Sequence, residues 1–303
     1  MAELPSVTVI VCTYRRPRQL QALLDSLALQ HVEGLRPCLC IVDNDAEQSA
    51  RELVAQAQQD FPWPIQYISQ PVKNIALTRN AGLSAVKSDY LAFVDDDEIA
   101  CSVWLSSLVF LAQKESAQLV FGPVLPVYPE NIAAWMIEGK FFERPRHNTG
   151  HYVPVGEART GNVLIDSAFI QNHGWKFDEK LGLSGGEDSA FFENMYRAGA
   201  LALWADEAEV FEEVPVDRAT VGWLLRRSFR IGSVEASLAC ARGSMWQICR
   251  IISKIGYLIV RSVILAVAMP FRKKSDNFKV LRSISLAAGI CYGLIAGPYN
   301  EYK

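Results

Sequence analysis

Short apolar runs alternate with helix-like segments through residues 7–94, and this alternation limits the possible fold more than any other feature of the chain. The runs have the composition of strands in the centre of a parallel sheet, and they are Val7–Cys12, Leu39–Val42, Ile65–Ser69 and Tyr90–Val94. Helices are predicted over three segments. Apolar spacing predicts a helix over 17–27, composition predicts one over 50–59, and a capping Asn74 predicts one over 74–86. This order predicts an α/β fold, with a mostly parallel sheet flanked by helices.

Three of these predicted strands end in polar clusters. The clusters are Thr13–Arg15, Asp43–Asp45 and Asp95–Asp97. Because ligands bind outside the carboxyl ends of parallel strands, we expect the three clusters to meet in one site. No Gly-x-Gly-x-x-Gly follows the first strand and no P-loop string occurs, so a dinucleotide fold or a P-loop enzyme is disfavoured.

The third cluster continues into a run of four acids, Asp95, Asp96, Asp97 and Glu98. Adjacent carboxylates repel one another at the end of a packed strand, so a divalent cation or a donor-rich ligand is expected there. Strand geometry would place Asp95 and Asp97 on one side and Asp96 on the other, which makes a clamp for a metal-bound diphosphate. The alternative is a polar loop in which an Asp caps a helix near 102–113.

The segment 123–157 is rich in Pro, Gly and aromatic residues, which indicates an elaborated loop over the site. His147 and His151 stand four apart, as helix-borne metal ligands would, but prolines and glycines around them disfavour a helix. A further strand over 161–165 and a short helix over 167–173 are predicted beyond the loop.

The string Gly185-Gly186-Glu187-Asp188 opens a helix that we expect to stop at Gly199. Ser184 and Glu187 fit a capping box, and acids in the first turn are favoured by the helix dipole. These local reasons account for Glu187 more readily than for Asp188. A carboxylate fixed at that position could serve as a general base.

The net charge of −3 conceals an uneven distribution, because residues 218–303 hold 14 Lys and Arg against three acids. An acidic body disfavours nucleic acid as a partner, whereas a basic, apolar tail suits an anionic membrane surface.

Neither apolar stretch of the tail, 248–269 or 284–298, is expected to span a membrane. Charges interrupt the first, and the second has about 15 residues against the ~20 required. Interfacial helices are predicted, with a core hairpin or a dimer contact as alternatives.

Seven cysteines, an odd number without a Cys-x-x-Cys pair, lie partly within apolar runs. The N-terminus lacks the basic-then-apolar pattern of a signal peptide. We therefore expect reduced thiols in a cytosolic compartment.

Six short motifs, in this order, resemble the family 2 glycosyltransferases with the GT-A fold: Val7–Arg15, Ile41–Asn44, Thr78–Gly82, Phe93–Asp97, Thr160–Asn162 and Gly185–Asp188. The resemblance implies a GT-A catalytic domain over 1–232, with a nucleotide-binding half (1–122) and an acceptor half (123–232). A basic and apolar helical tail, 233–303, would follow and associate with the membrane. The family implies sugar transfer from a nucleoside diphosphate donor, with UDP expected, Mg²⁺ or Mn²⁺ as cofactor, and inversion at the anomeric carbon.

Carried over residue by residue, the resemblance implies a set of roles. The nucleotide side would comprise Thr13, Tyr14, Arg15, Asp43, Arg79, Asp95 and Asp96. The metal would be held by Asp97 with Asp95, and the catalytic pair would be Asp188, as the base, and Glu187. The acceptor and phosphate contacts would be Asn162, Arg226, Arg227 and Arg230. For the three tail arginines, a solvated or membrane-facing basic face is the alternative.

No Gln-x-x-Arg-Trp string of processive synthases occurs, so one sugar per encounter is expected. The chain resembles bacterial exopolysaccharide glycosyltransferases, which implies a lipid-linked saccharide acceptor and a location at the cytoplasmic face of the inner membrane. Two other functions are alternatives. A sugar nucleotidyltransferase would need a Gly-rich loop after the first strand. A non-catalytic membrane-bound scaffold would have no need of both Asp97 and Asp188.

Overall fold

A seven-stranded sheet forms the centre of the first of two compact units in the computed structural model, which describes residues 3–183, 185–241, 245–267 and 272–299. The first unit comprises 1–127, 144–182 and 187–213, and the second comprises 128–143, 183–186 and 214–303. The predicted boundary at 232 falls inside a continuous helix, α8 (Val221–Ala241).

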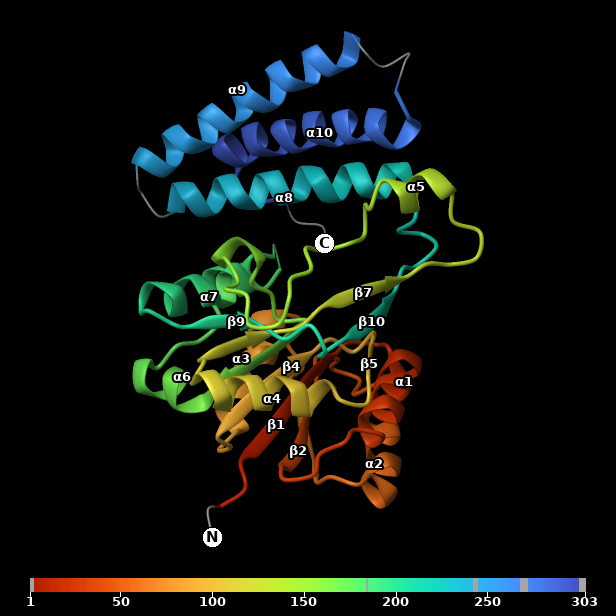
Figure 1. Ribbon diagram of the computed structural model, residues 1–303, viewed down its shortest axis with the longest axis vertical. Helices are drawn as coiled ribbons and strands as arrows, with labels where there is room; N and C mark the ends of the chain where they lie inside the picture. The colour runs from red at the N-terminus through yellow and green to blue at the C-terminus, as the bar shows by residue number, and fades with distance from the viewer. Residues whose placement is uncertain (1–2, 184, 242–244, 268–271, 300–303) are drawn as a thin grey trace. The chain divides into compact units, whose positions relative to one another are not determined.

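The sheet has the strand order β3-β2-β1-β4-β8-β6-β9. Figure 1 labels β1, β2, β4 and β9 of this sheet. The strands are β1 (Ser6–Thr13), β2 (Arg36–Asp43), β3 (Ile65–Ser69), β4 (Tyr90–Val94), β6 (Leu119–Phe121), β8 (Asn162–Asp166) and β9 (Ala202–Trp204). The first four run parallel, and β6 runs parallel to β9. Only β8 runs antiparallel to its neighbours β4 and β6. The predicted mostly parallel α/β sheet is confirmed.

Helices cover both faces of this sheet and bury two separate cores. The helices of the first unit are α1 (Pro17–Ala28), α2 (Arg51–Asp60), α3 (Ile75–Ala85), α4 (Trp104–Glu115), α6 (Ser167–His173) and α7 (Glu187–Arg197), with short 3₁₀ turns η1 (Val155–Glu157) and η2 (Glu179–Leu181). Strand β1 places Val9 in the core with α1, α2 and α4, and Ile10 in the core with α3, α6 and α7. The predicted cap of α3 is confirmed, because Asn74 Oδ1 accepts from Ala76 N at 2.9 Å.

A second, three-stranded sheet has the order β5-β10-β7, from β5 (Glu98–Ala100), β10 (Val210–Glu213) and β7 (Val124–Val127). Strand β5 begins at Glu98, the last of the four acids. The residue before α4 is Val103, which makes no side-chain cap. The alternative in which one of these aspartates caps the helix is therefore wrong.

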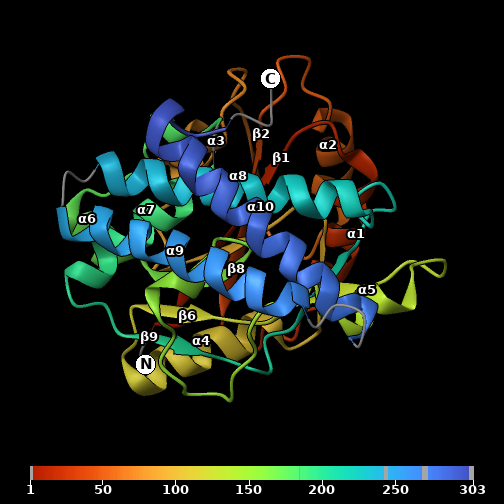
Figure 2. The ribbon, with the colours of Figure 1, turned by 90° about the horizontal axis from the view of Figure 1, so that it is seen from above.

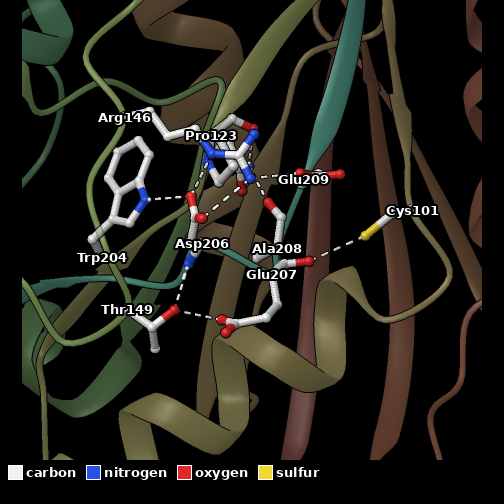
Figure 3. A network of polar contacts seen from close by, with 10 residues as sticks. Cys101, Pro123, Arg146, Thr149, Trp204, Asp206, Glu207, Ala208 and Glu209 are labelled. Atoms are coloured by element: carbon white, nitrogen blue, oxygen red, sulfur yellow. Dashed lines mark hydrogen bonds and ion pairs between the residues drawn. The ribbon is translucent and has the colours of Figure 1, made fainter.

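The expected long loop over 123–157 holds β7, η1 and a short helix, α5 (Ala134–Glu138), while its histidines lie outside any helix. A polar network fixes the end of this loop (Figure 3). Arg146 donates to Asp206 through two nitrogens, at 2.7 and 3.1 Å, and to Glu209 at 2.7 Å. Thr149 donates to Glu207 at 2.5 Å. The network ties the loop to the turn between β9 and β10.

The second unit is built from α8, α9 (Met245–Val267) and α10 (Lys274–Ala296), which pack against one another (Figure 2). Helices α8 and α10 touch through their backbones. A Cβ added at Gly289 or Gly293 of α10 would overlap the carbonyl oxygens of Phe229 and Ser233. Small residues at this contact allow the close approach.

Helix α10 begins at Lys274, before the apolar stretch predicted over 284–298, so the helix is longer than that stretch. Within the described part of the chain, α10 is the one helix long and apolar enough to cross a membrane, judged by length and composition. A third of its most apolar window is buried inside the structure.

Candidate active site

The ends of β1, β2 and β4 meet at one edge of the large sheet, as the topology predicts. Thr13 at the end of β1 pairs in register with Asp43 at the end of β2. Thr13 Oγ1 also donates to Asp96 Oδ2 at 2.8 Å, which connects β1 to the acid cluster. Arg15, which has a φ of 55°, donates to Asp45 at 3.1 Å. The three predicted polar clusters therefore form one site.

The acid cluster is a turn, and this changes the direction of its side chains. Strand β4 ends at Val94, and Glu98 N donates to Asp95 O at 3.2 Å. Arg16 Nη1 contacts both Asp96 Oδ1, at 2.9 Å, and Asp97 Oδ2, at 2.8 Å. The predicted alternation, with Asp95 and Asp97 on one side, is wrong because strand geometry stops before these residues.

The carboxyl groups of Asp95, which is partly exposed, and of Glu98, which is buried, both lie beside Gly161. A Cβ added at Gly161 would lie 3.0 Å from both Asp95 Oδ2 and Glu98 Oε1. Burial raises the pKa of Asp95 to about 6, and it raises the pKa of Glu98 well above the usual range. Glu98 Oε1 is buried without a hydrogen-bond partner. A side chain at residue 161 would crowd both carboxyl groups, so they would have to shift by a few tenths of an ångström.

A buried ion pair joins α3 to the first turn of α7. Arg79 Nη1 contacts Glu187 Oε1, and both side chains are largely shielded from solvent. Burial alone would lower the pKa of Arg79, but the charges of Glu187 and Asp95, and more weakly that of Asp188, raise it. Arg79 is therefore an electrostatic neighbour of both the acid turn and the Glu187-Asp188 pair.

Asp188 lies half-buried in the first turn of α7. Its Oδ1 accepts from Ser189 N at 2.7 Å. The preceding glycines, Gly185 and Gly186, have φ values of 83° and 93°, which favour glycine. The capping box predicted for Ser184 falls on a residue outside the described ones. The turn presents a carboxylate at the N-terminus of a helix, where negative charge is favoured.

Two predicted ligand-binding residues are buried in this structure, and their side chains form hydrogen bonds to other parts of the protein. Asp43 accepts from Ala50 N and Tyr67 Oη at 2.9 Å each, and from Asp45 N at 3.0 Å. Asn162 accepts from Trp104 Nε1 at 2.8 Å and donates to two backbone carbonyls. The predicted contacts of Asp43 with a base and of Asn162 with an acceptor stay predictions.

The other predicted residues fall in two places. Tyr14 lies at the site, with Lys73 Nζ 5.4 Å from the centre of its ring. Arg226, Arg227 and Arg230 lie on α8 in the second unit, where the Arg227 guanidinium covers the Trp223 ring at 5.0 Å. Their phosphate role stays a prediction.

The carboxylate oxygens at this site suit a hard divalent cation that takes its further ligands from a substrate. Within the described ranges, no three His, Cys, Asp or Glu side chains are grouped to hold a metal ion. Asp95 and Asp97 nonetheless supply carboxylate oxygens, and Mg²⁺-like ions often bind through one or two carboxylates plus substrate phosphates. His147 and His151 instead stack at 4.3 Å, and His147 pairs with Glu157.

Two residues at the site were missed by sequence reasoning. The sequence marks Arg16 only as part of a turn, although its place between Arg15 and the helix-starting Pro17 puts it beside the strand ends. Glu98 was counted as one acid of four, and no local pattern distinguishes its inward direction.

Comparison with known proteins agrees with this arrangement. The profile of Glycosyl transferase family 2 matches residues 8–169, which covers β1 to β8 and the acid turn. The chain belongs to this family. It is 35% identical to the succinoglycan biosynthesis protein ExoM of Rhizobium meliloti, over 95% of this chain and 93% of that protein.

Solved structures of other proteins share the fold. A mannosyltransferase of Pyrobaculum calidifontis, in complex with GDP-Man and Mn²⁺, superposes with a TM-score of 0.62 and 16% identity, over 97% of this chain and 88% of that one. Residues 1–349 of TarS from S. aureus, in complex with UDP, superpose with a TM-score of 0.57 and 16% identity, over 95% and 90%. These likenesses confirm the GT-A fold of this family 2 chain.

Proposed function

We propose that this family 2 enzyme transfers a sugar, with inversion, from a nucleoside diphosphate sugar to a lipid-linked saccharide during bacterial exopolysaccharide or cell-surface polysaccharide synthesis. One observation carries the proposal: the buried Arg79 forms an ion pair with Glu187, next to Asp188, and the charge of Asp95 in the acid turn also raises the pKa of Arg79. The candidate donor-binding acids and the candidate base therefore belong to one electrostatic cluster. The similarity to a succinoglycan biosynthesis protein supports the polysaccharide product.

The donor would bind where β1, β2 and β4 end, with Thr13, Tyr14 and Arg15 beside the nucleotide. Asp97 and Asp95 would hold Mg²⁺ or Mn²⁺ together with the diphosphate. When bound, the cation neutralises the charge that develops on the leaving diphosphate. The family resemblance makes UDP the expected nucleotide. One structural neighbour is in complex with UDP and another with GDP-Man.

Asp188 would accept the proton of the acceptor hydroxyl as that oxygen attacks the anomeric carbon. Inversion requires a base on the face opposite the leaving group, and Asp188 is held at the start of a helix by its own first turn. Glu187 anchors that turn through Arg79. The roles are thus divided, with Glu187 fixing the turn and Asp188 taking the proton.

The second unit would attach the enzyme to the cytoplasmic face of the inner membrane. Helix α9 is apolar on both sides: Ile251 and Leu258 face the helical core, while Ile252, Ile259 and Val263 are exposed. Arg250 and Arg261, which follow one flank of this exposed face, match the charge of an anionic leaflet. All seven cysteines are free thiols, which agrees with a reducing compartment.

Calorimetric titration tests the donor site. The protein is titrated with UDP, GDP and TDP, each with and without Mn²⁺. We expect one nucleotide to bind only with the metal, and binding to be lost in Asp97→Ala. Absence of binding to all three would overturn the proposal and favour a scaffold.

A further inference from the structure

Arg16 bridges two of the four acids at the candidate donor site. A single nitrogen, Nη1, lies 2.9 Å from Asp96 Oδ1 and 2.8 Å from Asp97 Oδ2. The Asp96 side chain is 6% exposed and that of Asp97 is 21% exposed. The guanidinium therefore fixes a buried carboxylate and a partly open one at the same time.

The backbone of Arg16 is itself held in place. Arg16 is the residue before α1, its carbonyl accepts from Leu20 N at 3.0 Å, and Pro17 restricts the next φ. Burial would lower the pKa of Arg16, but Asp96 and Asp97 raise it, so the side chain stays charged. A cation on a rigid helix start determines where the Asp97 carboxylate points.

The two oxygens of Asp97 differ in their surroundings. Oδ2 accepts from Arg16, whereas Oδ1 makes no hydrogen bond with any residue that the structure describes. Asp96 has both oxygens engaged, with Thr13 Oγ1 on Oδ2 and Arg16 on Oδ1. Of these two acids, Asp97 is thus the one with a carboxylate oxygen available to bind a cation.

We propose that Arg16 is a positioning residue, which holds Asp97 by Oδ2 so that Oδ1 is presented to the divalent cation of the nucleotide complex. Carboxylates that ligate metals are commonly oriented by hydrogen bonds of this kind, and loss of such a partner typically costs about 10- to 100-fold in metal affinity. The inference rests on the proposed function, because it takes Asp97 as a metal ligand.

A competing role for Arg16 makes the opposite prediction. If the guanidinium merely occupied the place of the metal, its removal would free Asp97 and tighten binding of the cation. If Arg16 only stabilised the fold, its removal would weaken binding of the nucleotide with and without metal to the same extent.

The experiment uses the full chain and three variants: Arg16→Gln, Arg16→Lys and, as a control, Arg36→Gln. Arg36 is a surface arginine in a 2.8 Å ion pair with Glu3, away from the proposed ligands. The wild type is first titrated with UDP and GDP in the presence of Mn²⁺, and the nucleotide that binds is used throughout. Bound Mn²⁺ is counted by electron paramagnetic resonance, and the affinity of the matching nucleoside monophosphate is measured without metal.

We expect Arg16→Gln to weaken binding of the Mn²⁺–nucleotide complex by about 10- to 100-fold. Monophosphate affinity should stay within about twofold, and Arg16→Lys should recover part of the loss because it keeps the charge. Unchanged or tighter Mn²⁺ binding in Arg16→Gln, or an equal loss of monophosphate binding, would overturn the inference. Should Arg16→Gln fail to fold, Arg16→Lys is tested alone, and tighter Mn²⁺ binding than in the wild type, or an equal loss of monophosphate binding, contradicts the role. A wild type that binds no nucleotide would refute the proposed function instead.

Discussion

The guanidinium of Arg79 is paired with the carboxylate of Glu187, and this buried contact joins α3 to the first turn of α7. Burial raises the pKa of Glu187 and Asp188 raises it further, while Arg79 opposes both effects. The two helices are far apart in sequence, so the pair connects the nucleotide side of the site to the turn that carries Asp188.

Removal of Arg79 should destabilise the fold strongly. In Arg79→Met the charge of Glu187 is left buried and unpaired, for which about 3–5 kcal/mol is expected at neutral pH. Urea unfolding measures this loss. The double variant Arg79→Met/Glu187→Gln should recover at least half of it, because no buried charge remains.

The cost of Arg79→Met should also depend on pH. Without its partner the pKa of Glu187 rises further above 4.5, so the folded form keeps a proton that the unfolded form releases. Stability relative to wild type should therefore fall as pH rises from about 5 to about 8. A pH-independent difference would contradict the charge argument.

The Arg146 network makes a second, opposite pH prediction. Partial burial would raise the pKa of Asp206, but the hydrogen bond from Arg146 lowers it below 3.8. Arg146→Gln should cost about 1 kcal/mol at pH 7, since the pair is partly exposed. Because the native carboxylate binds a proton only at lower pH, the cost should shrink as pH falls below about 4. Urea midpoints at pH 7 and pH 3 measure it, and an equal cost at both would exclude this linkage.

Two glycines of the second unit should respond differently to alanine. In Gly289→Ala the new methyl group overlaps the backbone of Phe229, so α8 and α10 must separate, at a cost of about 2 kcal/mol or more. Gly256 of α9 has open space, so Gly256→Ala should be neutral or stabilising by up to about 1 kcal/mol. Thermal unfolding of both variants provides the comparison. Similar destabilisation by both would refute the close contact.

The exposed face of α9 should decide membrane binding. Ile259→Glu/Val263→Glu places two acids on the apolar face, and we expect about a tenfold loss of binding to vesicles that contain anionic lipid. Leu29→Glu, at an exposed leucine just after α1, is the matched control. Co-sedimentation measures the bound fraction. Undiminished binding of the double variant would place the membrane contact elsewhere.

The architecture of the first unit follows from local patterns. Apolar runs predicted β1 to β4, and Asn74 predicted the start of α3, because strand composition and helix capping depend on neighbouring residues. No local pattern in the sequence indicates that β8 runs antiparallel, since the direction of this strand depends on how the chain returns to the sheet.

The details of the site depend on tertiary contacts that spacing cannot supply. Four consecutive acids indicated a ligand site, but their directions are set by the turn after Val94 and by Arg16. Likewise, the family resemblance implied a place for Arg79 on the nucleotide side, and the structure adds Glu187 as its buried partner. The residue types therefore indicated the chemistry of the site, but the folded structure was needed to show which side chains pair with one another.

Substitution of Asp188 by asparagine tests the central claim most directly. Sugar transfer is followed from a labelled nucleotide sugar to lipid-linked saccharides extracted from membranes, and metal-dependent nucleotide binding is measured on the same samples. The account predicts that Asp188→Asn loses transfer by at least about 10³-fold, because the base is removed, while nucleotide affinity stays within about threefold. Transfer at the wild-type rate, or a parallel loss of nucleotide binding, would contradict Asp188 as the base.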